Sequence, residues 1–364
     1  MASKASKKHY IVIVGARPNF IKAAAFFRGA RKNPHIKFTL IHTGQHFDEN
    51  MSKVFFEEMQ IPHPDINLDI KGEFHTEKIG KMFDSLKKIL SKKKIDGVIV
   101  FGDINSTLAG AVATAKNNIK LFHVESGLRS HDRRMPEEIN RVIVDHLSDI
   151  LFTSEPIGKE NLLKEGVEKS KIIPVGNIMI ESLEAFKSNI ELSDILTALK
   201  LKPRSYVVAT IHRQENTDDK KILQRLFMLL NEINKVEPVI IPLHPGTKNK
   251  LINFKLGNLL KKLHVVEPLG YFEFLKLVSQ SNGVVTDSGG IQEETSHMGI
   301  ACATLRDNTE RPVTITLGTN KLFPISEMDD KTAQEILKHL KRAKKETRIP
   351  LWDDKVSDRI FKHL

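Results

Sequence analysis

The stretch VVTDSGGIQEETSHMG, residues 284–299, shows in one run how the chain is built. An apolar segment ends at Asp287, the turn Ser288-Gly289-Gly290 follows, and a helical pattern begins behind it. The two glycines let the backbone approach a ligand closely, and the free N–H groups at the start of a helix attract an anion. The stretch therefore predicts a buried strand, a tight turn and a helix whose N-terminus binds a diphosphate.

Charged side chains near this turn support that prediction. Glu294 lies one helical turn further on, where its carboxylate can accept two ribose hydroxyls. Arg306 and Arg311 follow in RDNTERP, and guanidinium groups pair readily with phosphate. We therefore expect a nucleotide to bind at this edge.

Outward from this stretch, short apolar runs alternate with helical patterns along the chain. The spacing of apolar residues predicts helices over 75–93 and 217–235, the second with Thr217 as its N-cap. Such alternation is typical of parallel sheets with right-handed crossovers. We predict an α/β protein with two Rossmann-like, doubly wound domains and a substrate cleft between them. The predicted strands are residues 10–14, 38–42, 97–101, 120–124, 150–153 and 172–175 in the first half, and 206–210, 239–242, 264–266, 283–287 and 301–305 in the second.

Length and composition limit the alternatives. The chain has 364 residues, more than the roughly 250 to 300 at which one core stops growing, so two domains are expected. Cys302 is the only cysteine, which excludes an intramolecular disulfide and favours a cytoplasmic location. The net charge of +11 is spread over Lys-rich helical faces without a nucleic-acid-binding signature, and no apolar stretch has membrane-spanning length. We expect neither nucleic acid nor a membrane as partner.

The residues that follow each strand carry the candidate chemistry, because ligands of doubly wound sheets bind beyond the carboxyl ends of the strands. After the first strand, VGARPNF holds one glycine, Gly15, where a dinucleotide fingerprint needs three, and it lacks the Gly-Lys-Ser/Thr of a P-loop. Arg17 precedes Pro18, which fixes the backbone before a helix, so its guanidinium is a candidate phosphate ligand. A surface arginine at a turn is the alternative.

Acidic residues follow later strands of the first half. Asp103 in FGDINSTLAG and Glu125 in HVESGLRS come directly after buried strands, and Glu137 and Glu138 open a helix behind Pro136. One such carboxylate is explained as a helix cap or by the helix dipole. Several that converge on one edge suggest general acid and base catalysis, since crowding raises the pKa of at least one of them.

Histidines occupy the equivalent positions in the second half. His212 and Arg213 follow a strand in ATIHRQEN, and His244 does so in IPLHP. A lone histidine is most often structural, but two at equivalent strand ends favour a functional role. The HxxxH pattern of His42 and His46 has no carboxylate at zinc-ligand spacing, so we predict no metal site.

Together these motifs resemble those of the non-hydrolysing UDP-N-acetylglucosamine 2-epimerases, over the whole chain and in the same order. The resemblance implies a GT-B architecture with an N-terminal Rossmann-like domain at 1–176, a UDP-binding domain at 177–347 and a C-terminal helix at 348–364 that crosses back. It also implies a homodimer and a reaction without a cofactor. The motifs are VIVGARPNFIKAA, HTGQHFDENM, FGDINSTLAG, HVESGLRS, RMPEEINR, ATIHRQEN, TDSGGIQEET and RDNTERPV.

The reaction implied by the resemblance inverts carbon 2 of the sugar. UDP is eliminated anti to the departing proton, a 2-acetamidoglucal forms, and UDP adds back with a proton on the other face. By motif, the catalytic residues are Asp103, Glu125, Glu137 and His212, with Asp103 as the expected base and Glu125 and Glu137 sharing the return proton. The residues on substrate- and UDP-binding positions are Arg17, Lys22, Arg213, His244, Ser288, Gly289, Gly290, Glu294 and Arg311.

Two departures bear on regulation and substrate. Close bacterial members carry arginines associated with a second, activating UDP-N-acetylglucosamine, whereas this chain has Phe47 at the first such position, so we do not expect that activation. The segments GARPNFIKA and ENMSKVFF resemble the branch that includes epimerases of UDP-2,3-diacetamido-2,3-dideoxy-glucuronate. The expected substrate is a UDP-sugar, with UDP-N-acetylglucosamine first and the diacetamido-glucuronate as the alternative.

Three other functions stay open from the sequence, because a fold does not fix a function. A hydrolysing 2-epimerase would release free N-acetylmannosamine. A GT-B glycosyltransferase would need an acceptor site but not several carboxylates around the sugar. A nucleotide-sugar sensor would bind without turnover.

Overall fold

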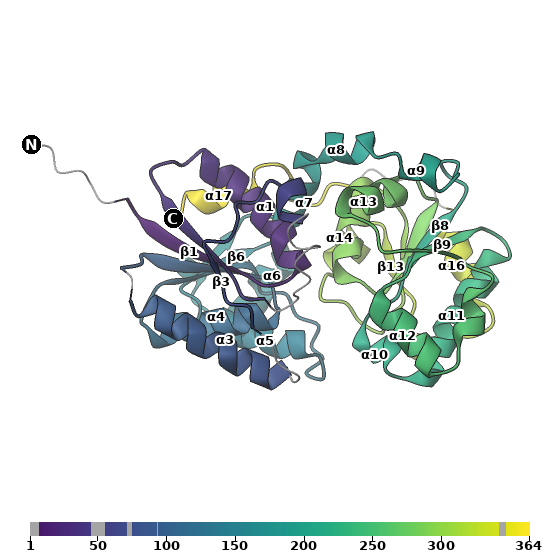
Figure 1. The fold of residues 1–364 in the computed structure, drawn as a ribbon, viewed down its shortest axis with the longest axis horizontal. Helices are drawn as coiled ribbons and strands as arrows, with labels where there is room; N and C mark the ends of the chain where they lie inside the picture. Colours follow the sequence, from purple (N-terminus) through teal and green to yellow (C-terminus); the bar gives the residue numbers. More distant parts are fainter. Residues whose placement is uncertain (1–6, 45–54, 71–74, 93, 342–346) are drawn as a thin grey trace, which may run out of the picture. The chain divides into compact units, whose positions relative to one another are not determined.

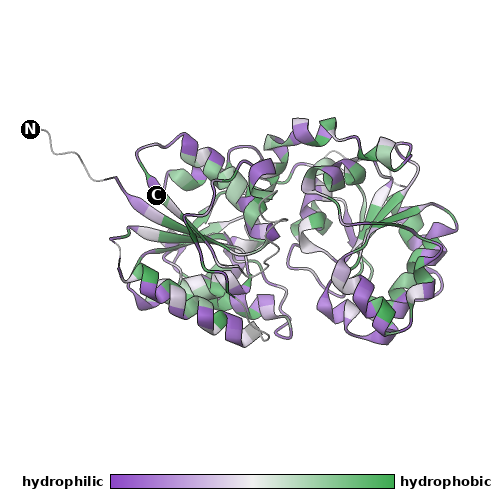
Figure 2. Ribbon diagram, viewed as in Figure 1, coloured by the Kyte–Doolittle hydropathy of each residue, from purple (hydrophilic) through white to green (hydrophobic). Residues whose placement is uncertain are grey.

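The computed structural model describes residues 7–44, 55–70, 75–92, 94–341 and 347–364. The chain divides into two compact units: Met1–Ala185 with Pro350–Leu364, and Phe186–Ile349. Each unit is a parallel sheet covered by helices on both faces, with the apolar residues concentrated on the strands (Figures 1 and 2). The α/β class and the doubly wound arrangement predicted from the sequence are confirmed.

The first unit contains seven parallel strands in the order β3-β2-β1-β4-β5-β6-β7. The order reverses between β1 and β4, so a ligand is expected beyond the carboxyl ends of these two strands. Helices α3, α4 and α5 cover one face, and α1, α7 and α17 cover the other (Figure 1). The strands are β1 His9–Val14, β2 Lys37–His42, β3 Ile66–Asn67, β4 Gly97–Phe101, β5 Leu121–Ser126, β6 Ile150–Thr153 and β7 Ile172–Pro174. The helices are α1 Arg17–Arg31, α3 His75–Leu90, α4 Asn105–Lys116, α5 Pro136–Leu147, α6 Pro156–Lys164, α7 Ile178–Ala185 and α17 Val356–Phe361.

The second unit contains six parallel strands in the order β10-β9-β8-β11-β12-β13, which reverses between β8 and β11. One core lies between the sheet and α11 with α16, and the other packs α9 and α13 on the opposite face. The strands are β8 Val207–Thr210, β9 Val239–Pro242, β10 His264–Val266, β11 Gly283–Thr286, β12 Cys302–Thr304 and β13 Asn320–Leu322. The helices are α8 Lys187–Leu192, α9 Ile195–Ala198, α10 Gln214–Thr217, α11 Lys220–Asn234, α12 Pro245–Asn253, α13 Tyr271–Ser279, α14 Gly289–Met298, α15 Val313–Thr316 and α16 Thr332–Leu340.

The predicted N-cap of α11 is wrong. Thr217 ends the short helix α10, and Asp219 caps α11 by accepting hydrogen bonds from the backbone N–H groups of Lys221 at 2.7 Å and Ile222 at 3.0 Å. A carboxylate satisfies two of the free N–H groups at the helix start and also suits the positive end of the helix dipole.

Helices α7 and α17 both pack on α1 in the first unit. The Ser182 hydroxyl of α7 donates a hydrogen bond to the carbonyl oxygen of Ile21. The ring of Phe361 in α17 lies 5.0 Å from that of Phe26, measured between centroids, and a Cβ on Gly29 would lie 2.7 Å from Ser357 Cβ. Figure 1 shows yellow α17 beside purple α1.

Among the described residues, no helix is both long enough and apolar enough to cross a bilayer.

Candidate active site

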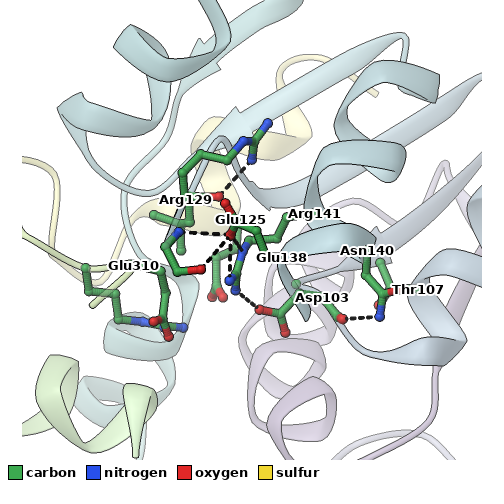
Figure 3. A network of polar contacts seen from close by, with 12 residues as sticks. Asp103, Thr107, Glu125, Arg129, Glu138, Asn140, Arg141 and Glu310 are labelled. Carbon is green, nitrogen blue, oxygen red and sulfur yellow. Dashed lines mark hydrogen bonds and ion pairs between the residues drawn. The ribbon is translucent and has the colours of Figure 1, made fainter. Parts of the chain in front are cut away.

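Asp103 lies just beyond β4, where the strand order of the first sheet reverses. Its carboxylate forms an ion pair with Arg141 of α5, and its carbonyl oxygen accepts a hydrogen bond from Asn140 Nδ2 at 2.8 Å (Figure 3). Ile104 is the N-cap of α4, so helix capping does not explain this carboxylate. The Asp103 side chain is 22% exposed. It is held in place yet accessible, as a proton carrier must be.

Glu125, the next-to-last residue of β5, is in a strained conformation. Its φ is +69°, a left-handed conformation that costs a non-glycine residue roughly 1–2 kcal/mol, and the pairing of β5 with β6 shifts register here. Its Oε2 lies 2.7 Å from Lys22 Nζ of α1, and both side chains are almost completely buried. Strain of this kind persists where the surrounding structure enforces it, often at functional sites. In this structure Lys22 balances the charge of Glu125, and a role for Lys22 in UDP binding stays a prediction.

A buried histidine joins the turns that carry Asp103 and Glu125. His123 of β5 contacts the carbonyl oxygen of Gly102 through Nε2 at 2.8 Å and Asp145 Oδ1 through Nδ1 at 2.7 Å. Asp145 Oδ2 also accepts a hydrogen bond from Arg129 Nη1 at 2.7 Å. Burial alone would raise the pKa of Asp145, but His123 and Arg129 hold it below its ordinary value. The network is sequestered and fixes the backbone on either side of the candidate carboxylates.

The two acidic residues that open α5 have different surroundings. Glu138 is buried and accepts hydrogen bonds from the N–H groups of Ser130 and His131, both at 2.9 Å, and from Arg141 Nη2 at 2.9 Å. Burial opposes its charge, but these donors lower the pKa of Glu138 below its ordinary value. Glu137 is only half-buried. Glu138 therefore holds the loop and Arg141, while Glu137 is the candidate for proton transfer.

In the second unit, His212 and Asp287 lie where the strand order reverses between β8 and β11. Asp287 is fully buried and accepts hydrogen bonds from the backbone N–H groups of His212 and Arg213 and from Asn216 Nδ2, each at 3.0 Å. His212 Nδ1 lies 3.1 Å from Asp287 Oδ1, while the His212 side chain is 43% exposed. The imidazole is thus anchored on one side and accessible on the other.

The predicted order of strand, turn and helix is present, but α14 already begins at Gly289, so both glycines belong to the helix. Ser288 is the N-cap of α14, and the first turn of this helix carries no acidic residue. A Cβ on Gly289 would lie 2.6 Å from both Arg311 Nη1 and Glu310 Oε1, so a larger residue here would displace the ends of these two side chains. Arg311 Nε lies 2.9 Å from Glu293 Oε1, and its Nη1 pairs with Glu310.

Two further arginines surround Glu310. Arg306 Nη2 lies 2.8 Å from Glu310 Oε2, and Arg213 Nη2 lies 3.5 Å from Glu310 Oε1. Arg306 and Glu310 are buried, and Arg213 is mostly so. The Arg311 guanidinium lies against Gly289 at the start of α14, and a guanidinium beside a helix N-terminus suits a diphosphate.

The remaining candidates of the second unit have defined partners. Glu294 is buried, and its Oε1 accepts a hydrogen bond from the Tyr271 hydroxyl at 2.9 Å. His244 is the N-cap of α12, where its Nδ1 accepts a hydrogen bond from the N–H of Gly246 at 3.1 Å. Partial burial and the nearby His212 lower the pKa of His244 below its ordinary value. A neutral His244 with its proton on Nε2 is a hydrogen-bond donor.

The remaining candidates of the first unit are Arg17 and the histidine pair His42 and His46. Arg17 is exposed at the start of α1, with its guanidinium carbon 5.2 Å from the centroid of the Phe55 ring. His42 is buried, with Nδ1 3.3 Å from Asn67 Oδ1, whereas His46 and Phe47 lie outside the described residues. Within the described part of the chain, no three His, Cys, Asp or Glu residues group as metal ligands.

Some contacts that shape these sites were missed in the sequence. Arg141 follows Glu138 by three residues on one helix face, a spacing that indicates an ion pair. His123, Asp145 and Asp287 give no such signal, because their partners come from other strands and helices.

Residues 28–364 match the family profile described as UDP-N-acetylglucosamine 2-epimerase. A UDP-N-acetylglucosamine 2-epimerase of Methanocaldococcus jannaschii is 41% identical over 97% of this chain and 98% of that protein. A UDP-2,3-diacetamido-2,3-dideoxy-D-glucuronate 2-epimerase of Pseudomonas aeruginosa is 42% identical over 86% and 87% of the two chains.

A solved structure agrees with the sequence match. The crystal structure of the M. jannaschii UDP-GlcNAc 2-epimerase in complex with UDP-GlcNAc and UDP matches with a TM-score of 0.91, at 39% identity over 98% of this chain and 99% of that one. Both the GT-B-like fold and the resemblance predicted from the motifs are confirmed. The chain belongs to the UDP-N-acetylglucosamine 2-epimerase family.

Proposed function

We propose that this chain inverts carbon 2 of a UDP-N-acetylhexosamine, converting UDP-GlcNAc to UDP-ManNAc. The observation that carries the proposal is the pair of strand-end carboxylates in the first unit. Asp103 and Glu125 are each held by a cation, Arg141 and Lys22 respectively. The family match supports the assignment.

The proposed reaction exchanges a proton and a leaving group without net oxidation. A base removes the proton of carbon 2, the electrons of that bond form a double bond to carbon 1, and UDP departs with the electrons of the carbon–oxygen bond. UDP then attacks carbon 1 again while carbon 2 receives a proton on the opposite face. No carbonyl acidifies the departing proton, so proton carriers and leaving-group stabilisation must lower the barrier.

The two units supply different parts of this chemistry. In the first, Asp103 serves as base and Glu125 and Glu137 provide the return proton, with Lys22 balancing Glu125 and Arg17 as a phosphate ligand. In the second, the start of α14 at Ser288-Gly289-Gly290 binds the diphosphate.

Side chains around that turn complete the nucleotide site. Arg213 and Arg311 neutralise the diphosphate, and Glu294 accepts the ribose hydroxyls. His244 donates a hydrogen bond through Nε2, and His212 acts at the departing phosphate. Charge stabilisation of the leaving group lowers the barrier to elimination.

A panel of UDP-sugars followed by proton NMR tests the proposal. We expect UDP-GlcNAc and UDP-ManNAc to interconvert without added cofactor. Release of free N-acetylmannosamine would identify a hydrolysing enzyme, and turnover only with an acceptor would identify a glycosyltransferase; either result would contradict the proposal.

A second substrate has a specific observation in its favour. The P. aeruginosa relative, named for the diacetamido-glucuronate, is 42% identical over 86% of this chain, against 41% over 97% for the M. jannaschii relative. The same panel should therefore include UDP-2,3-diacetamido-2,3-dideoxy-glucuronate. A kcat/KM for that compound at least tenfold above that for UDP-GlcNAc would assign it as the substrate.

The homodimer and the cytoplasmic location are also proposals. The resemblance to the family supports the first, and the single cysteine supports the second. Light scattering of the purified chain should give twice the monomer mass, and a monomer at micromolar concentration would contradict the homodimer.

A further inference from the structure

His212, the anchored imidazole of the second unit, contacts Asp287, a residue without a role in the reaction proposed above. Asp287 lies at the end of β11, and His212 follows β8, its neighbour in the sheet. The Asp287 carboxylate faces His212 Nδ1 at 3.1 Å and is fully buried, whereas almost half of the His212 side chain is exposed. The contact is therefore built from the sheet itself at the point where ligands bind.

We propose that Asp287 is a positioning residue for the reaction: it holds the proton on His212 Nδ1 and thereby leaves Nε2 to exchange a proton with, or donate one to, the phosphate of UDP. This inference rests on the proposed function. An ionised carboxylate can accept hydrogen bonds but cannot donate one, so the ring nitrogen that faces it must carry a hydrogen. The other nitrogen, Nε2, is then the one left to face the phosphate.

The surroundings keep Asp287 ionised. It accepts hydrogen bonds from the N–H groups of His212 and Arg213 and from Asn216 Nδ2. Burial would raise its pKa, but the charge and hydrogen bond of His212 and these donors hold the pKa below the ordinary value. A buried carboxylate with this many donors stays charged at neutral pH.

Other charged or ionisable groups also lie near His212. His244 faces it from the N-cap of α12, with ring centroids 6.5 Å apart, and Arg213 follows it in the chain. Arg213 in turn is paired with Glu215 and Glu310. Among the described residues, the Asp287 carboxylate contacts the imidazole directly, with Oδ1 3.1 Å from Nδ1, and so fixes the orientation of the ring.

A purely structural role of Asp287 would also explain some of its contacts, because its hydrogen bonds from backbone N–H groups hold the loop after β8. The two roles differ in what they predict. A structural role affects folding and UDP binding, whereas a positioning role depends on the presence of the imidazole.

The test combines D287N, H212N and the double variant in the full chain, with kcat measured on UDP-GlcNAc and UDP affinity measured by calorimetry. We expect D287N to lower kcat by 100-fold or more with UDP affinity within about threefold, since losing the carboxylate behind a serine-protease histidine costs about 10,000-fold. In the H212N background the same change should cost less than threefold. An equal loss in both backgrounds, or a collapse of UDP binding in D287N, would overturn the proposal. D149N serves as the matched control. Asp149 also accepts a hydrogen bond from a backbone N–H, that of Leu121, but at the start of β5 and not at the carboxyl end of a strand. The kcat of D149N should therefore equal that of the unmodified chain.

A second measurement needs neither turnover nor a folded D287N. In the chain labelled with 15N-histidine at pH 8, the His212 signals, recognised by their loss in folded H212N or by their response to UDP, should show a protonated Nδ1 and an unprotonated Nε2. A proton on Nε2 instead would overturn the proposal. Absence of epimerase activity in the unmodified chain would remove the proposed function but leave this measurement to decide the pairing.

Discussion

At the residue scale, the three candidate proton carriers differ in what holds them. Asp103 pairs with Arg141, Glu125 pairs with Lys22, and Glu137 is half-buried at the start of α5. The ion pairs hold the Asp103 and Glu125 carboxylates in place. Proton transfer, and not nucleotide binding, is therefore the property that their removal should affect.

The amide variants D103N, E125Q and E137Q test that assignment. Each variant keeps the shape of the side chain but cannot accept or release a proton. We therefore expect kcat to fall roughly 100-fold to 10,000-fold while UDP affinity stays within threefold. Proton NMR gives kcat and calorimetry gives the affinity. E168Q, at an exposed position, is the matched control. Unchanged turnover in a variant would remove that carboxylate from the mechanism.

Arg311 is expected to bind UDP and also pairs with two buried glutamates, Glu293 and Glu310. Two measurements on R311A distinguish these roles. In R311A, UDP affinity should weaken by about 1.5–3 kcal/mol, the scale of a charge-assisted contact. The buried Glu293 and Glu310 would also lose a partner, so the free energy of unfolding should fall by about 3–5 kcal/mol. Calorimetry with UDP and urea denaturation measure the two losses. Unchanged affinity in a folded R311A would place the nucleotide elsewhere.

His244 makes stability depend on pH in a defined direction. Its pKa in the folded chain is lowered from 6.5, so the unfolded chain binds more protons in the range below 6.5. The contribution of neutral His244 to the free energy of unfolding is complete above pH 6.5, and it is lost as pH falls through the lower pKa of the folded chain. H244N keeps an N-cap and removes the titration, so its free energy of unfolding should fall less than that of the unmodified chain between pH 7.5 and 5.5. We expect a difference of a few tenths of a kcal/mol because the group is exposed; a reversed sign would contradict the account.

At the element scale, the strands were predictable because each is a short apolar run followed by polar residues. Every strand predicted from the sequence is present, whereas β3 and β13 were missed. These two have two and three residues and lie at the edges of their sheets, so they carry little pattern of their own. The cap of α11 could not be chosen from the sequence alone, since both Thr217 and Asp219 are good capping residues.

The C-terminal helix α17 stabilises the first unit through its contact with α1. Phe361 packs against Phe26 and Phe38, with ring centroids at 5.0 and 5.8 Å. Truncation in F361A should lower the free energy of unfolding by about 3–5 kcal/mol, because it leaves a cavity in this aromatic cluster. Urea denaturation measures the loss, and K362A at an exposed neighbouring position is the control. Equal stability of F361A and the unmodified chain would show that α17 contributes nothing.

At the scale of the whole molecule, the sequence predicted where chemistry lies but not how each group is held. Strand-end position was enough to select Asp103, Glu125 and His212, because the parallel topology brings the carboxyl ends of strands to one edge of a sheet. Their partners could not be predicted, since Lys22 and Asp287 meet them only after distant elements pack. A buried ion pair depends on tertiary geometry and has no local sequence pattern.

The central claim is that carbon 2 is inverted by loss and return of a proton, and turnover in heavy water tests it most directly. Because the return proton comes from a side chain that exchanges with solvent, the product should carry deuterium at carbon 2 of the sugar. Proton NMR would then show the loss of that signal in the epimer that forms. Epimer that retains its original hydrogen at carbon 2 would contradict the account.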